Sequence, residues 1–212
     1  MRFPDRSKAG QLLAQKLAGY ANNPDVVVLA LPRGGVPVGF EVARSLKVPL
    51  DIIVVRKLGV PHHEELAMGA IASGDVRVLN DDTIDWLQIP NSVIERVTEI
   101  EKAELRRRES AYRGTAPSLD PAGKIAILVD DGIATGSTMR AAVAVVRSRD
   151  PQRIVIAVPT APASTAKELA NVADDFVSIV TADIFVGVGH WYDDFRQVSD
   201  EVTRELYECA RL

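Results

Sequence analysis

The sequence is poor in cysteine, with Cys209 alone among 212 residues. No disulfide can therefore form within the chain, and a reducing compartment is expected. No apolar run approaches the roughly 20 residues that a membrane-spanning helix needs. The first residues, MRFPDRSKAG, also lack the apolar centre of a secretory signal. We expect a cytoplasmic protein with no membrane partner.

An excess of positive charge is missing as well. Lysine and arginine number 25 against 29 aspartate and glutamate residues, which gives a net charge of -4. Proteins that hold nucleic acid through bulk charge have a basic balance or patch, so no nucleic-acid partner is expected. A hydrophobic fraction of 47% and this length fit a single globular domain over residues 1–212.

Several apolar runs show no polar alternation, which is typical of strands buried on both faces of a parallel sheet. The predicted strands are 25–32, 50–57, 124–131, 153–160 and 175–180, with shorter pieces at 67–72 and 76–79; the predicted helices are 7–20, 37–46, 92–112 and 164–172. Ser92 and Glu95 form a capping-box pattern at the start of the third helix. The alternation predicts an α/β fold with a doubly wound, mostly parallel sheet flanked by helices. Ligands of such folds bind at the carboxyl ends of the strands.

One of these strands leads into the segment ILVDDGIATGSTMRAA, residues 127–142. Thr135, Gly136, Ser137 and Thr138 lie where a loop opens a helix, and unpaired N–H groups at such a point bind anions. Ser137 stands where a Walker loop has its lysine, so this is another kind of phosphate loop. The alternative is that the hydroxyls merely cap the helix. A cap explains one hydroxyl and leaves the others unexplained.

Asp130 and Asp131 come directly before this loop. Carboxylates do not help to bind a phosphate, but they accept hydrogen bonds from sugar hydroxyls or hold a divalent cation. The ligand should therefore carry a phosphate at one end and a diol or a metal ion nearby. A ribose 5-phosphate meets both requirements.

The stretch ILVDDGIATGST resembles the signature with which type I phosphoribosyltransferases bind 5-phosphoribosyl 1-pyrophosphate (PRPP). The resemblance implies that Asp130 and Asp131 bind the ribose hydroxyls, directly or through Mg²⁺, and that residues 134–138, from Ala134 to Thr138, hold the 5-phosphate. It also implies the type I fold, with a core at about 7–80 and 115–180. A helical insertion would occupy 81–114, and a small C-terminal hood and tail 181–212.

A second motif, LPRGGVPVGFEVA, follows the first predicted strand. It is similar to the pyrophosphate loop of xanthine-guanine phosphoribosyltransferases. By that match Arg33, Gly34 and Gly35 bind pyrophosphate, and the Pro32–Arg33 peptide bond is expected to be cis. Lys57 lies in a segment that resembles the Arg-Lys-x-Gly stretch of adenine phosphoribosyltransferases, where basic residues approach PRPP.

Residues 182–198, ADIFVGVGHWYDDFRQV, contain four aromatic side chains. Packing on a sheet edge is one explanation, and a wall for stacking a base is the other. The stretch resembles the hood of hypoxanthine-guanine phosphoribosyltransferases. That resemblance implies that Phe185 stacks on the base and Arg196 reaches pyrophosphate, with Asp193 or Asp194 contacting the base.

The run His62-His63-Glu64-Glu65 could suggest a metal site, but adjacent residues rarely reach one ion and the HExxH spacing is absent. A solvated, mobile loop is the favoured interpretation, and such a loop could close over a reaction.

Two departures bear on the acceptor. Ala134 stands where 6-oxopurine enzymes have an aspartate, and 159–160 stands where they have a lysine. Ordinary hypoxanthine-guanine salvage is therefore not expected. The whole chain most resembles a group of uncharacterised phosphoribosyltransferases of bacteria and archaea.

The resemblance implies a Mg²⁺-dependent transfer from PRPP to a small nitrogen acceptor, a purine-like nucleobase, in a homodimeric salvage enzyme. Its catalytic residues would be Arg33, Lys57, Asp130, Asp131 and Arg196. A non-catalytic sensor of PRPP or nucleotides, and a phosphoribosyl hydrolase, remain as alternatives on the same scaffold.

Overall fold

A five-stranded parallel sheet forms the centre of the protein. The computed structural model describes residues 1–61, 63–74, 76–114 and 116–211. The strands are β1 (Val26–Ala30), β2 (Leu50–Ile52), β6 (Ile125–Val129), β7 (Arg153–Pro162) and β8 (Asp175–Ala182), in the spatial order β2-β1-β6-β7-β8. All four neighbouring pairs are parallel. β8 forms one edge, and seven of its eight residues are half-buried, whereas the residues of β1 are fully buried.

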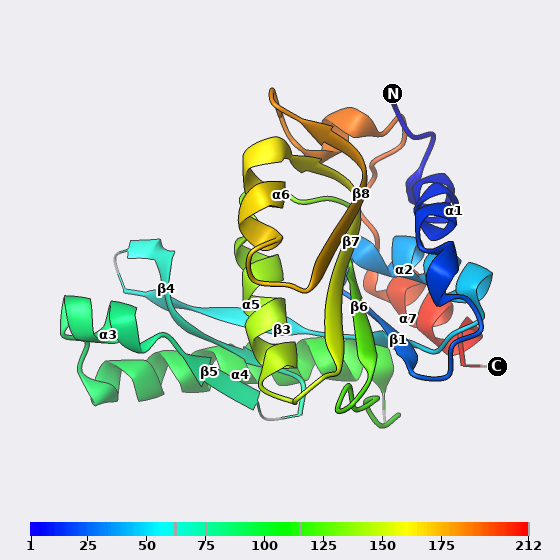
Figure 1. Cartoon of the computed structure of the whole chain (residues 1–212). Coiled ribbons are helices and arrows are strands. Elements are labelled where there is room, and N and C mark those ends of the chain that lie inside the picture. The colour runs from blue at the N-terminus through cyan, green and yellow to red at the C-terminus, as the bar shows by residue number, and fades with distance from the viewer. Residues whose placement is uncertain (62, 75, 115, 212) are drawn as a thin grey trace.

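Helices cover both faces of this sheet (Figure 1). α1 (Arg6–Lys16), α2 (Gly35–Leu46) and α7 (Asp200–Cys209) lie on one face, and α5 (Ser137–Arg147) and α6 (Ala163–Leu169) lie on the other. Successive residues of a strand point to opposite faces. Val26 and Val28 of β1 accordingly pack into one core, and Val27 and Leu29 into the other. This arrangement confirms the predicted doubly wound fold.

A second, antiparallel sheet departs from the first. It consists of β3 (Val55–Val60), β4 (His63–Ala72) and β5 (Val76–Leu79), followed by α3 (Asp81–Leu87) and α4 (Asn91–Arg113). These elements, residues 55–113, form an arm that extends to the left in Figure 1. A buried ion pair fastens its end to the body: Nη2 of Arg113 lies 2.9 Å from Oδ1 of Asp51, whose residue is 1% exposed.

The prediction of one strand over 50–57 was wrong, because the chain changes sheets in the middle of the run. The N–H of Ile53 still donates to the carbonyl of Ala30, the last residue of β1. The next residue, Val54, instead pairs with Ser73 of the other sheet: the N–H of Ser73 donates to the carbonyl of Val54 at 3.2 Å. Lys57 therefore lies inside β3, not at the end of a strand of the central sheet.

Two local predictions also need correction. α4 begins after Pro90, which occupies the N-cap position, so Ser92 falls in the first turn and the Ser92–Glu95 capping box does not form. His63 begins β4 and pairs with Val60, so the backbone of 63–65 belongs to a strand and not to a loop. His62 lies outside the described residues.

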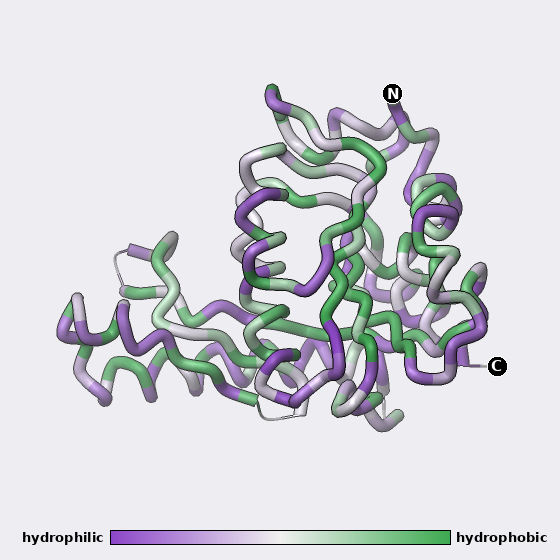
Figure 2. Tube along the Cα trace, in the orientation of Figure 1, coloured by the Kyte–Doolittle hydropathy of each residue, from purple (hydrophilic) through white to green (hydrophobic). Residues whose placement is uncertain are grey.

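The remaining short elements are two 3-10 helices, η1 (Ala18–Tyr20) and η2 (Val188–Trp191). Figure 2 shows hydrophobic residues concentrated along the central strands, while polar and apolar residues alternate along the helices of the arm. Across the described ranges, no helix combines the length and apolar character that crossing a membrane requires.

Candidate active site

The site is built where the carboxyl ends of β1 and β6 meet. Asp130 and Asp131, the acid pair, follow β6, and Gly34 and Gly35, the glycine pair, follow β1. A Cβ added at Gly34 would lie 2.1 Å from Oδ2 of Asp131, and one added at Gly35 would lie 2.8 Å from Cα of Asp130. Such distances leave no room for a side chain. The structure thus brings the predicted pyrophosphate loop against the predicted ribose-binding carboxylates.

The peptide bond between Pro32 and Arg33 is cis, as predicted. The Arg33 side chain, however, points to the start of α7. Its Nη1 lies 3.2 Å from Oδ1 of Asp200, and both side chains are one-third exposed. The backbone of the predicted pyrophosphate loop is therefore next to the acid pair, while its guanidinium contacts another element.

The acid pair lies in an environment that opposes its charge. The N–H of Asp131 donates to Oδ1 of Asp130 at 2.8 Å, and Nε of Arg6 donates to Oδ2 of Asp131 at 2.7 Å. Burial raises the pKa of Asp130 well above its ordinary value, and repulsion from Asp131 adds to this. Burial also raises the pKa of Asp131, although Arg6 opposes the effect. A cation or hydroxyl donors beside these carboxylates would stabilise their ionised forms.

The predicted phosphate loop, residues 134–138, follows the acid pair in the chain. Gly136 is the N-cap residue of α5 with a φ of 75°, a left-handed conformation that glycine adopts most readily. Among the described residues, no side chain caps this helix, so the capping interpretation of the hydroxyls was wrong. The N–H groups of the first turn are thus left without a side-chain acceptor, as an anion site requires.

Side chains outside the loop donate hydrogen bonds to two of its carbonyl groups. Oγ1 of Thr165 donates to the carbonyl of Ala134 at 3.1 Å, and Nη2 of Arg140 donates to that of Thr135 at 2.5 Å. Thr135 and Ser137 place their hydroxyl oxygens 3.3 Å apart. The loop therefore presents hydroxyl and N–H donors from a backbone that its neighbours fix.

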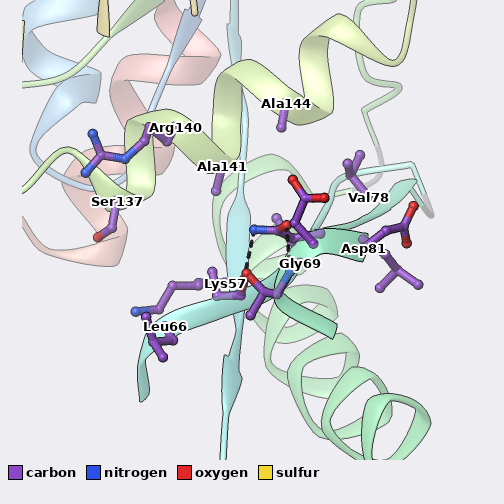
Figure 3. A pocket seen from close by; sticks show the side chains of 15 residues that line it. Lys57, Leu66, Gly69, Val78, Asp81, Ser137, Arg140, Ala141 and Ala144 are labelled. Carbon is purple, nitrogen blue, oxygen red and sulfur yellow. Dashed lines mark hydrogen bonds between the residues drawn. The ribbon is translucent and has the colours of Figure 1, made fainter. Parts of the chain in front are cut away.

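Lys57 lies beside the same loop. It lines a cavity of about 700 Å³ together with Ser137 and Arg140 of α5. Figure 3 shows these three side chains on the same side of the cavity. Small and apolar residues of the arm and of α5 line the rest of it, together with the polar residues Asn80–Thr83 at the start of α3. The structure thus brings Lys57 near the phosphate loop, although it comes from a strand of the other sheet.

The predicted residues of the hood contact one another and the N-terminal segment. Phe185 stacks on Trp191 with ring centres 6.2 Å apart. Asp193 pairs with Arg2 at 3.0 Å. Arg196 pairs with Asp194, and its side chain is 89% exposed. None of these contacts joins the hood to the glycine pair.

Sequence reasoning missed the residues that do connect the hood to the acid pair. The Tyr192 hydroxyl donates to the carbonyl of Asp131 at 2.5 Å, and the Arg6 guanidinium lies 4.0 Å from the ring centre of Phe195. Arg6 precedes Asp131 by 125 positions, so no local spacing indicates the contact. The available signal was physical, since two adjacent buried carboxylates need a counter-cation.

No group of three or more histidine, cysteine, aspartate or glutamate side chains gathers as a metal site within the described part of the chain. The acid pair alone offers two carboxylates. Such a donor set can share a metal ion with a ligand that supplies further oxygen atoms.

Comparisons with known proteins agree with this geometry. The family model described as "Phosphoribosyl transferase domain" matches residues 5–194. The Mycobacterium tuberculosis protein named "Putative phosphoribosyl transferase Rv0571c" is 46% identical over 199 residues, which cover 94% of this chain and 45% of that protein. The chain thus spans about half the length of the curated relatives it matches.

The fold is similar to that of several solved structures. The crystal structure of TT1426 from Thermus thermophilus has a TM-score of 0.90 and 40% sequence identity, with 98% of each chain covered. The AQ2163 protein from Aquifex aeolicus has a TM-score of 0.51 and 11% identity, with 83% of this chain and 74% of that chain covered, and shows a likeness of fold alone.

Proposed function

This chain belongs to the phosphoribosyl transferase family and has the type I phosphoribosyltransferase fold, and from this premise we propose that it transfers the 5-phosphoribosyl group of PRPP to a nitrogen acceptor and releases pyrophosphate. The observation that carries the proposal is the contact of the glycine pair with the acid pair. A pyrophosphate held by the backbone of Gly34 and Gly35 would lie next to a diol held by Asp130 and Asp131.

The proposed ligand extends across three neighbouring subsites. Its 5-phosphate binds the uncapped N–H groups and hydroxyls of the phosphate loop, and its ribose hydroxyls donate to the acid pair. Its pyrophosphate binds the glycine pair and Lys57. The acceptor, a purine-like base, lies against the hood, where Phe185 and Asp193 are the candidate contacts.

In the proposal, the side chains of Arg33 and Arg196 move to contact pyrophosphate when the ligand binds. Each is paired with an aspartate in this structure, Asp200 and Asp194 respectively. Ion pairs whose side chains are at least one-third exposed contribute only about 0–1 kcal/mol. Both guanidinium groups can therefore leave their partners when a more highly charged anion binds.

Mg²⁺ fits the proposed site as an ion shared with the ligand. It prefers oxygen donors and is commonly held by one or two carboxylates together with substrate phosphates. The acid pair supplies two such carboxylates, and burial makes their ionised forms costly without a cation. When bound, the ion would neutralise charge on the pyrophosphate as it leaves.

In this proposal, the protein groups act on charge that changes during the reaction. Positive charge develops on the ribose ring as its bond to pyrophosphate breaks, and the acid pair stabilises that charge. Lys57 and the Gly34 N–H group bind the departing anion more tightly than the intact ligand, which is the condition for lowering the barrier. Since the motifs contain no general base, the acceptor reacts from a tautomer with a free lone pair on nitrogen.

The test is to incubate the protein with PRPP, Mg²⁺ and a panel of purine and pyrimidine bases, and to measure released pyrophosphate and the nucleotide formed. Turnover with one base and loss of that turnover in Asp130→Asn support the proposal. Binding of PRPP without turnover on any base would support the non-catalytic sensor instead. Absence of PRPP binding would contradict both.

A further inference from the structure

We infer that Arg6 is a positioning residue for the acid pair: it holds one oxygen of Asp131 so that the other oxygen faces the ribose diol. The inference rests on the proposed function and assigns a role to a residue outside the sequence motifs. Arg6 begins α1, the first helix of the chain, while Asp131 follows β6.

The Arg6–Asp131 contact is short and shielded from water. Nε of Arg6 lies 2.7 Å from Oδ2 of Asp131, and the two side chains are 11% and 13% exposed. Nη1 of Arg6 also donates to the carbonyl of Arg196 at 2.8 Å. A guanidinium that donates from two of its nitrogens in different directions has a defined orientation, so the carboxylate it binds is oriented too.

Aromatic rings of the hood complete the enclosure of Arg6. Its guanidinium carbon lies 4.0 Å from the ring centre of Phe195 and 5.9 Å from that of Tyr192. The two rings stack with centres 5.1 Å apart. Cation–π contacts of this kind stabilise a desolvated cation. The Tyr192 hydroxyl also donates to the Asp131 carbonyl at 2.5 Å, so one cluster holds both the backbone and the side chain of this aspartate.

The hydrogen bonds of the acid pair divide its four oxygens into two sets. Oδ1 of Asp130 accepts the Asp131 N–H, and Oδ2 of Asp131 accepts from Arg6. Within the described residues, Oδ2 of Asp130 and Oδ1 of Asp131 accept no hydrogen bond. Neither oxygen is fully buried, so a ligand can reach both. Each aspartate therefore keeps one open oxygen, which matches a diol that has two hydroxyl donors.

Without Arg6 the carboxylate of Asp131 would have no cation to offset its burial and nothing to select its rotamer. It would lose its orientation toward the diol, while the phosphate loop, which Thr165 and Arg140 fix independently, would keep its geometry. Loss of Arg6 should therefore weaken recognition of the sugar and leave recognition of the phosphate intact.

The experiment measures binding of ribose 5-phosphate and of inorganic phosphate by calorimetry, and KM for PRPP, in Arg6→Met, Arg6→Lys and Lys8→Met. Lys8 is an exposed cation on the same helix and serves as the matched control. Arg6→Met should bind ribose 5-phosphate about 10- to 100-fold more weakly, as when a group that orients a ligand-binding residue is lost. Its phosphate affinity should stay within about twofold. Arg6→Lys keeps the charge but not the planar guanidinium with its several donors, so it should recover part of the affinity for ribose 5-phosphate. Lys8→Met should match the wild type in both affinities.

Three results would overturn the inference. The first is wild-type affinity of Arg6→Met for ribose 5-phosphate, which leaves the proposed function standing. The second is a parallel loss of ribose 5-phosphate and phosphate binding, since that indicates general damage. The third is a wild-type protein that binds phosphate but neither ribose 5-phosphate nor PRPP, which contradicts the proposed function itself. If Arg6→Met does not fold, Arg6→Lys carries the test, and ribose 5-phosphate affinity equal to that of the wild type then refutes the inference.

Discussion

Replacing Gly34 with alanine tests the contact on which the proposed site depends. Gly34 has φ -61° and ψ -34°, a conformation that alanine adopts without strain. The new methyl group would, however, lie 2.1 Å from Oδ2 and 2.6 Å from Cγ of Asp131. The carboxylate must move, and with it the ion pair to Arg6. Any destabilisation by this substitution therefore comes from packing against the acid pair.

Two opposing contributions set the expected change in stability. Replacing a glycine by alanine at a compatible conformation stabilises a protein by about 0.4–1 kcal/mol, because the unfolded chain becomes less flexible. Overpacking a dense region costs about 1–3 kcal/mol. The net effect of Gly34→Ala should be a loss of about 1–2 kcal/mol in the free energy of unfolding. In a domain of this size that lowers Tm by about 2–8 °C.

The assay is thermal and urea unfolding of Gly34→Ala, with Gly19→Ala as the matched control. A Cβ at Gly19 would meet nothing within 4 Å, so this variant should be as stable as the wild type or more stable by about 0.4–1 kcal/mol. Gly34→Ala should also bind ribose 5-phosphate more weakly, because Asp131 is displaced. A Gly34→Ala protein with the stability and the affinity of the wild type would refute the reasoning.

Further predictions concern other parts of the molecule. Burial raises the pKa of Asp130 above its unfolded value, so the contribution of Asp130 to stability is fully present below about pH 4 and is lost as pH rises through the folded pKa. Asp130→Asn should therefore be more stable than the wild type at pH 7. Urea unfolding at several pH values should show that this difference in stability vanishes in acid. Asp51→Ala leaves Arg113 buried without its carboxylate and should lower the free energy of unfolding by about 3–5 kcal/mol, measured by urea titration; a loss below about 1 kcal/mol would contradict this view of how the arm is fastened. Lys57→Ala should lower kcat/KM for PRPP by about 10²–10³-fold at unchanged Tm. Lys102→Ala removes a lysine of α4 whose side chain is 30% exposed and pairs with Glu99, and its turnover should match that of the wild type; unchanged turnover of Lys57→Ala would remove Lys57 from the site.

The elements that are continuous in sequence were predictable. β1, β6 and β7 are apolar without alternation because helices cover both of their faces. The position of residues 134–138 at the start of a helix could be predicted because this loop is one short segment. The cis bond at Pro32–Arg33 was predictable through the resemblance of the surrounding motif.

Contacts that depend on tertiary structure were not predictable. The apolar run of 50–57 does not reveal that the chain passes from the central sheet to the antiparallel sheet at Val54, because a strand of either sheet needs the same residue types. The partners of Arg33 and Arg196 were also hidden. Each guanidinium pairs with an aspartate that no motif assigned to it. Arg6 is the strongest case, because its partner lies 125 residues away.

The N-terminal segment meets the hood beside the acid pair, and this constrains the order in which the protein can fold. The N–H of Phe3 donates to the carbonyl of Trp191 at 2.7 Å, and the N–H of Asp193 donates to that of Phe3 at 2.8 Å. Contacts between such distant segments form late, because closing a long loop is entropically unfavourable until the intervening chain is folded.

The loop 134–138 lies within one short segment, whereas the contacts of Phe3, Trp191 and Arg6 join segments that are far apart in the chain. In the proposed site, phosphate binding depends on the first and sugar binding on the second. Recognition of the ribose would then require that residues 2–6 and 188–196 have come together, a condition that phosphate binding alone does not impose.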